Sequence, residues 1–122
     1  MFGGNMRILG IDPGLTRCGV GIVDLNANRR ATFVSVHVIR TPSTNELPAR
    51  LFELESGLTE LFETYRPDAI AIERVFSQHN VRTAMGTAQA SAVAMLIAAR
   101  NNLDVAMYTP TEVKAAVTGY GR

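Results

Sequence analysis

The sequence has few of the features that mark secreted, membrane-spanning or zinc-bound proteins. Cys18 is the single cysteine, which excludes an intrachain disulfide and a zinc cage built from thiolates. Residues 1–6 have neither the charged start nor the apolar stretch of a signal peptide. No uninterrupted apolar run is long enough to span a membrane. We therefore expect one cytoplasmic domain, residues 1–122, folded around a hydrophobic core.

An overall excess of charge is also lacking, because the net charge is only +1. The distribution is uneven, however. Five arginines and two aspartates give residues 1–42 a charge of +3, and two arginines and seven acids give residues 43–73 a charge of −5. Four arginines, one lysine and two acids give residues 74–122 a charge of +3. Basic ends around an acidic middle suit binding to an anionic polymer, although an ordinary mixed surface explains the same counts.

What is present begins with an opening strand and the turn that ends it. Three apolar residues around a glycine, residues 8–11, predict a strand buried on both faces. Asp12 stands where this strand ends. Pro13 fixes φ and Gly14 suits a positive φ, so the chain is expected to turn at once. A carboxylate held there could bind a metal or a phosphate, or it could simply begin an Asp-Pro-Gly turn.

Two further strands are expected after this turn, over residues 18–24 and 31–41. The short connections predict an antiparallel meander of three strands. In the third strand, three valines alternate with Ser35 and His37, which places His37 on the polar side of the strand. A half-exposed histidine fits that position better than a metal ligand.

A helix over residues 47–65 follows, because leucines and aromatic residues recur there at spacings of three and four. Asn45 is the expected N-cap, with Pro48 in the first turn. Four acidic residues lie off the apolar stripe: Glu46, Glu53, Glu60 and Glu63. This acidic surface is expected to point away from any nucleic acid.

A second carboxylate repeats the opening pattern, because the short apolar strand of residues 69–72 is followed at once by Glu73. A helix links this strand to the meander, so it should run parallel to the first strand. Asp12 and Glu73 would then emerge at one edge of the sheet, where open α/β sheets bind ligands. Paired carboxylates favour a hard cation such as Mg²⁺. The alternative is an ion pair between Glu73 and an arginine such as Arg74.

The remaining pattern predicts a helix over residues 83–101, a strand over residues 104–108 and a last helix. The first of these is rich in alanine and apolar around much of its circumference, which predicts deep burial, close packing or a subunit interface. A capping box at Thr109–Glu112 opens the last helix and accounts for Glu112 without a function. The fold class is therefore α/β, with a five-stranded mixed sheet, an antiparallel meander followed by parallel strands, flanked by helices.

Four segments together resemble the RuvC family of bacterial Holliday-junction resolvases. The resemblance implies an RNase H-like fold, and the segments match in order and spacing across essentially the whole chain. They are Gly10–Gly14 with Thr16 and Gly19, Ala71–Phe76, Gly86–Ala90, and Val113–Lys114 with Gly119 and Gly121.

This resemblance implies a homodimeric endonuclease that makes paired nicks in four-way DNA junctions during recombination and repair. It implies Mg²⁺ as cofactor, with Mn²⁺ as a substitute and two ions per complete site. Asp12 and Glu73 match two catalytic, metal-binding acids of the family. A branch-migration helicase complex is a further partner that the family alone implies.

The resemblance also names residues for DNA binding. Phe76 matches an aromatic residue that reaches the DNA near the crossover, and Gln78 and Asn80 share its polar loop. Lys114 matches a basic residue near the scissile phosphate. Beyond Gly121 the family continues with a basic residue and a helix that bears the remaining catalytic acids. We therefore expect the chain to be a fragment that lacks this helix and cuts poorly.

Two other classes of function remain open from the residues. Asp12, Gly14 and Thr16 also resemble the first phosphate-binding turn of actin-like ATPases and sugar kinases, which need a second domain and a second phosphate loop. A DNA-binding module without catalysis is the third class. Cleavage of a labelled junction with and without Mg²⁺ would separate the three.

Overall fold

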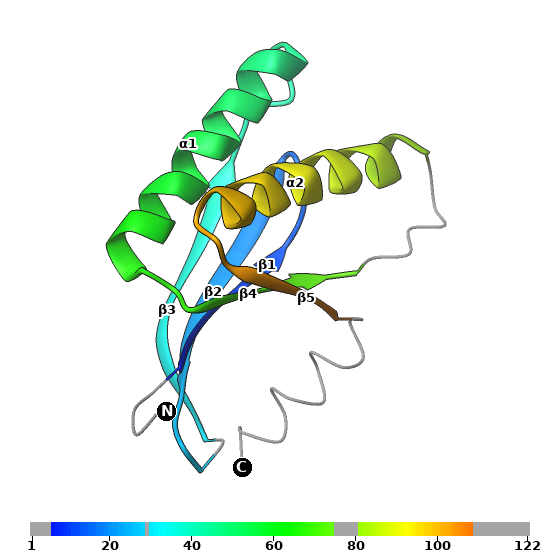
Figure 1. Ribbon diagram of the computed structural model, residues 1–122. Helices are drawn as coiled ribbons and strands as arrows, with labels where there is room; N and C mark the ends of the chain where they lie inside the picture. Colours follow the sequence, from blue (N-terminus) through cyan, green and yellow to red (C-terminus); the bar gives the residue numbers. More distant parts are fainter. Residues whose placement is uncertain (1–5, 29, 75–80, 109–122) are drawn as a thin grey trace.

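A computed structural model of the chain describes residues 6–28, 30–74 and 81–108 (Figure 1). These ranges contain five strands and two helices. In chain order they are β1 (Met6–Asp12), β2 (Arg17–Leu25), β3 (Ala31–Arg40), α1 (Leu47–Tyr65), β4 (Ala69–Glu73), α2 (Val81–Arg100) and β5 (Asp104–Tyr108). The predicted α/β class and its elements are confirmed. The expected last helix after Thr109 lies outside the described residues.

The strands form one mixed sheet in the order β3-β2-β1-β4-β5. β2 is antiparallel to both β1 and β3, which confirms the meander. β4 is parallel to β1, and β5 is parallel to β4, as expected for strands joined by helical crossovers. Ile11 pairs with Ile72, so the next residues of the two strands, Asp12 and Glu73, are neighbours at one edge of the sheet.

The core lies between one face of this sheet and the two helices, which are side by side on that face (Figure 1). Leu9 and Ile11 of β1 are buried there. Ile8 and Gly10, which point to the other face, are only partly buried by the described residues. The prediction that β1 is buried on both faces is therefore wrong, because only one of its faces is fully buried among the described residues. The buried apolar residues from the helices are Leu54, Leu58, Phe62, Ala90, Ala94, Ile97 and Ala98.

Val36 and Val38 of β3 face away from the core, contrary to the expectation, whereas Val34 packs against it. His37 pairs with the buried Val20 and so points to the helices, whereas Val36 and Val38 are 65% and 47% exposed on the other face. His37 Nε2 lies 2.8 Å from the Ser35 hydroxyl and 3.2 Å from the Tyr65 hydroxyl of α1. These hydroxyls give the imidazole polar partners under the helix, so it need not face solvent.

The start of α1 also differs from the expectation. Glu46 occupies the N-cap position without a side-chain cap, so the prediction of Asn45 as N-cap is wrong. The Asn45 amide instead donates to the Pro42 carbonyl at 3.1 Å, which places Asn45 in the preceding turn. Pro48 does lie in the first turn, and the four glutamates of the acidic surface are exposed as expected. Neither helix in the described ranges has the length and hydrophobicity needed to span a membrane.

Candidate active site

Asp12 and Glu73 meet at the edge of the sheet where β1 and β4 end, as the sequence predicts. Each is the last residue of its strand, and each follows a buried isoleucine. Strand alternation turns both side chains to the face away from α1 and α2. Asp12 is exposed and Glu73 is half-buried. Two carboxylates are thus held together by the rigid backbone of two paired strands.

The closeness of the two acids changes the protonation of Glu73. Burial raises the pKa of the Glu73 carboxyl to about 7, and a hydrogen bond to Asp12 and the charge of Asp12 add to this effect. Near neutral pH Glu73 therefore keeps its proton in part of the molecules, because burial and the neighbouring Asp12 disfavour its ionised form. A cation bound between them would replace that proton.

The donor set of this pair fits a hard divalent cation. Carboxylate oxygens are the ligands that Mg²⁺ and Mn²⁺ prefer, with water or phosphate completing the shell. In the described ranges neither acid forms an ion pair with arginine or lysine, and Arg74, the expected competitor, forms none with Glu73. The same ranges contain no cluster of three or more acidic, histidine or cysteine side chains that could hold a metal. These two acids are therefore the protein ligands that the described part supplies.

The turn after Asp12 depends on Gly14, but for a different reason from the one expected. Gly14 has an ordinary negative φ, so the expectation of a positive φ is wrong. A Cβ at this position would instead collide with the backbone carbonyl oxygen of Arg17. Pro13 of the same turn is buried. The turn is therefore so tight that the returning strand β2 leaves no room for a side chain at Gly14.

Cys18 lies beneath this turn as an inert part of the core. It is fully buried, and burial raises the pKa of its thiol to about 11. A backbone hydrogen bond from Gly14 opposes this shift, and the charge of Asp12 adds to it. The thiol stays protonated at neutral pH and supplies neither a nucleophile nor a metal ligand to the site.

Two residues that hold the turn were not singled out by the sequence pattern. Thr41, the residue after β3, is 1% exposed, and its hydroxyl donates to the Leu15 carbonyl at 2.5 Å. Arg50 of α1 donates to the hydroxyls of Thr16 and Thr41. Arg50 and Thr16 are 34 positions apart in the chain, and periodicity within one helix carries no signal for such a contact.

The remaining predicted site residues lie outside the described residues. They are Phe76, Gln78, Asn80 and Lys114. On either side of the first three, Arg74 and Val81 are exposed.

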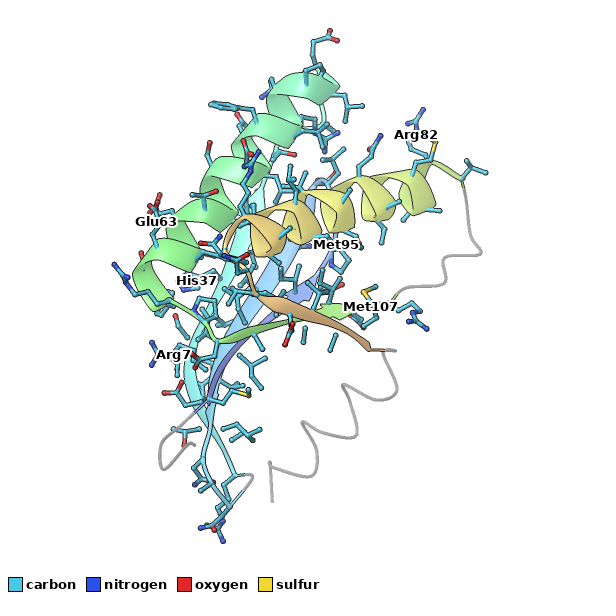
Figure 2. The ribbon with its side chains drawn as sticks, in the orientation of Figure 1. Arg7, His37, Glu63, Arg82, Met95 and Met107 are labelled. Atoms are coloured by element: carbon cyan, nitrogen blue, oxygen red, sulfur yellow. The ribbon has the colours of Figure 1, made fainter. Side chains whose placement is uncertain are left out.

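The outer surface of α2 is a second candidate for function. Its inner side is buried against the sheet and α1, whereas apolar residues on its outer side are exposed, among them Met85 (56%), Met95 (41%, labelled in Figure 2) and Leu96 (49%). We call this row the outer stripe of α2. Its members are Val81, Met85, Ala88, Ala92, Met95, Leu96 and Ala99.

Comparison with known proteins gives consistent matches over nearly the whole chain. The family model described as "Crossover junction endodeoxyribonuclease RuvC" matches residues 8–122. Proteins of that name from Streptomyces avermitilis and Thermobifida fusca are 62% and 58% identical over 117 residues, or 96% of this chain. The match covers 66% and 64% of those proteins, so the chain spans about two thirds or less of their length.

A solved structure gives the same result. The structure titled "T. thermophilus RuvC in complex with Holliday junction substrate" superposes with a TM-score of 0.84 at 27% identity. The superposition covers 96% of this chain and 71% of that one. The RNase H-like fold implied by the sequence resemblance is confirmed.

Proposed function

The chain belongs to the RuvC family, and from this premise we propose that it forms the nuclease domain of an enzyme that resolves four-way DNA junctions. The observation that carries the proposal is the pair of Asp12 and Glu73 at the ends of two parallel strands. Family membership favours this function over the phosphate-binding turn of an actin-like ATPase or sugar kinase. We place the protein in the cytoplasm, because its single cysteine needs no oxidising compartment and its proposed substrate is DNA.

We assign Asp12 and Glu73 as ligands of Mg²⁺, with Mn²⁺ as a substitute and two ions in the complete site. When bound, such ions activate a water and stabilise the leaving oxygen of the phosphodiester. The chain's own part is to fix two oxygen donors on adjacent strands, so that little reorganisation is needed when the metal arrives. Glu73 must lose its proton to serve as a ligand, and this makes binding stronger above pH 7 than below it.

DNA contacts are assigned to the residues that the family resemblance names. Phe76, three residues after Glu73, would stack on a base near the crossover, a contact worth about 1–3 kcal/mol. Gln78 and Asn80 would bind nearby, and Lys114 would approach the scissile phosphate. The acidic surface of α1 supports this orientation, because its exposed glutamates repel DNA on the far side of the sheet.

A homodimer is part of the proposal, because two matched nicks in a four-way junction call for a two-fold protein. The outer stripe of α2 supports it: small alanines alternate there with exposed methionines, which permits close packing of a second helix. Ala92→Glu is expected to give monomers in analytical sedimentation, whereas Ser56→Glu on the exposed side of α1 leaves the dimer intact. An unchanged dimer in Ala92→Glu would contradict this interface. A helicase partner is carried over from the family alone.

Cleavage of a labelled four-way junction tests the function directly. We compare the chain as it stands with the same chain continued by whatever segment follows the matched region in the Streptomyces avermitilis relative. The continued protein should make paired nicks in Mg²⁺, and the chain alone should bind the junction but cut it poorly, because two acids supply few ligands for two ions.

Two variants and a substrate control complete this test. In the continued protein, Asp12→Asn and Glu73→Gln should each lower the nicking rate by about 100-fold or more while junction binding persists, because each removes a charged oxygen from the site. A linear duplex should resist cutting. Wild-type rates in either variant would overturn the assignment of the active site.

A further inference from the structure

The turn that carries Asp12 is tied to α1 by a chain of hydrogen bonds. The Thr41 amide donates to the Thr16 carbonyl at 3.1 Å, and the Thr41 hydroxyl donates to the Leu15 carbonyl at 2.5 Å. Arg50 then donates from Nε to the Thr41 hydroxyl at 3.0 Å and from Nη2 to the Thr16 hydroxyl at 2.9 Å. Its Nη2 also reaches the Thr41 carbonyl at 3.3 Å. One guanidinium therefore joins the turn to the end of β3.

The support behind Arg50 is rigid. Its own amide donates to the Glu46 carbonyl at 3.0 Å in the first turn of α1. One turn later the helix carries Leu54, which is fully buried in the core together with Leu58. The planar fork of an arginine is fixed by two hydroxyls at once, so its position is well defined relative to the core.

The bonding pattern indicates that Arg50 has a task other than charge pairing. Two other arginines of the described ranges, Arg7 and Arg100, each pair with a carboxylate. Arg50 is half-buried and bonds to two hydroxyls and a carbonyl instead. The Thr41 hydroxyl both accepts from Arg50 and donates to the Leu15 carbonyl, and almost no surface of Thr41 reaches solvent.

We propose that Arg50 is a positioning residue for Asp12. Through Thr16 and Thr41 it fixes residues 13–16, and this sets the direction in which the Asp12 carboxylate leaves β1. Partners of metal ligands act in this way, because they hold a ligand in one orientation and so raise metal affinity. The proposal rests on the proposed function, in which Asp12 is the metal ligand.

The test uses the whole chain and reads the turn and the metal separately. Hydrogen exchange of the Thr41 amide reports the bond between β3 and the turn. Mn²⁺ titration by calorimetry at pH 8 reports the carboxylate pair. Arg50→Met keeps the apolar stem and removes the fork, Arg50→Lys keeps only the charge, and Arg100→Met is the matched control that removes an exposed ion pair with Glu55.

We expect Arg50→Met to speed exchange at Thr41 while the amides of Ile70 and Ile72 in β4 keep their rates. Mn²⁺ affinity should fall by about 10-fold or more. Arg50→Lys should also have a lowered Mn²⁺ affinity, and Arg100→Met should have the wild-type affinity. Thr41→Val should resemble Arg50→Met, and the double variant should be no worse than either single one, because the residues act as one unit. Thr41→Ser, which keeps the hydroxyl, should retain the wild-type affinity.

Two results would overturn the proposal in distinguishable ways. Unchanged Mn²⁺ affinity in a folded Arg50→Met variant, or exchange that rises equally at Thr41 and in β4, would show that Arg50 has only a general structural role. A wild-type chain that binds no Mn²⁺ would contradict the proposed function itself, and the positioning role would fall with it.

Discussion

The two ends of strand β1 use charge in opposite ways. At its start, Arg7 (labelled in Figure 2) donates from Nε and Nη2 to the two carboxylate oxygens of Asp24 at 2.8 and 3.0 Å, and from Nη1 to the Tyr65 carbonyl at 3.1 Å. The Arg7 amide also donates to Asp68 at 2.7 Å. This end of the sheet is thus joined to β2, to the end of α1 and to the approach to β4 by paired groups.

At the other end of β1, Asp12 faces a second acid rather than a base. The pKa of Glu73 rises to about 7 there, mainly through burial and then through Asp12, whereas Arg7 holds the pKa of Asp24 below its ordinary value. The paired end therefore stabilises the fold, and the end with two acids carries a repulsion that a cation would relieve. The Arg7–Asp24 pair of opposite charges adds to the stability of the fold. The Asp12–Glu73 pair of like charges lowers it, as is common where a site is arranged for binding.

The largest expected effect comes from crowding the turn at the acidic end. Gly14→Ala places a methyl group against the Arg17 carbonyl and should destabilise the fold by about 1–3 kcal/mol, because a backbone atom must move. Gly21→Ala in β2 is the matched control, since open space surrounds that position. It should be neutral or add about 0.4–1 kcal/mol by restricting the unfolded chain. Urea denaturation measures both, and equal effects would show that the turn is not tight.

The paired end can be broken at Arg7. Arg7→Met removes the fork to Asp24 and the bond to the Tyr65 carbonyl, so the melting temperature should fall. Arg100→Met removes only the more exposed ion pair with Glu55 and should have a smaller effect.

The loss of stability in acid gives a second test of the Arg7–Asp24 pair. Because the pKa of Asp24 is lowered in the folded state, its contribution is present above the ordinary value of 3.8 and is lost as the pH falls through the folded pKa. Arg7→Met should lose less stability on acidification than wild type.

The acidic end should show the opposite dependence on pH, with a smaller effect. The pKa of Glu73 is raised from 4.5 to about 7, so between these values the folded chain binds more protons than the unfolded chain. Its contribution to stability therefore declines as the pH rises through this window. Glu73→Gln should be more stable than wild type at pH 8 and nearly equal at pH 4. Glu60→Gln, at an exposed position of α1, should show no such trend in thermal melts.

Most of the fold follows from local patterns in the sequence. Apolar spacing places α1 over Leu47–Tyr65, and a helix between two apolar strands makes β4 parallel to β1. The orientation of β3 does not follow, because valines and polar residues alternate there with the same period. The hydroxyl of Tyr65, supplied by a distant helix, gives His37 a partner on the inner face and leaves Val36 outside.

The candidate site also contains some residues that the sequence predicts and others that it does not. Asp12 and Glu73 can be predicted because each ends a short apolar strand, and strand direction brings such ends together. The role of Gly14 was misjudged, since the space it leaves is filled by Arg17 of the next strand and local turn preferences do not show this. Arg50 and Thr41 could not be found, because their bonds join β3 and α1 to the turn only in the folded chain.

Binding of a divalent cation to the acidic end tests the account most directly. The measurement is calorimetric titration of the chain with Mg²⁺ and Mn²⁺ at pH 8, where Glu73 is ionised. The variant is Asp12→Asn, and the control is Asp104→Asn, which removes an exposed acid at the start of β5. We predict binding by wild type and Asp104→Asn, and an affinity lowered by about 10-fold or more in Asp12→Asn, which lacks one charged ligand. Equal affinities for Asp12→Asn and wild type would contradict the assignment of this end of the sheet as the metal site.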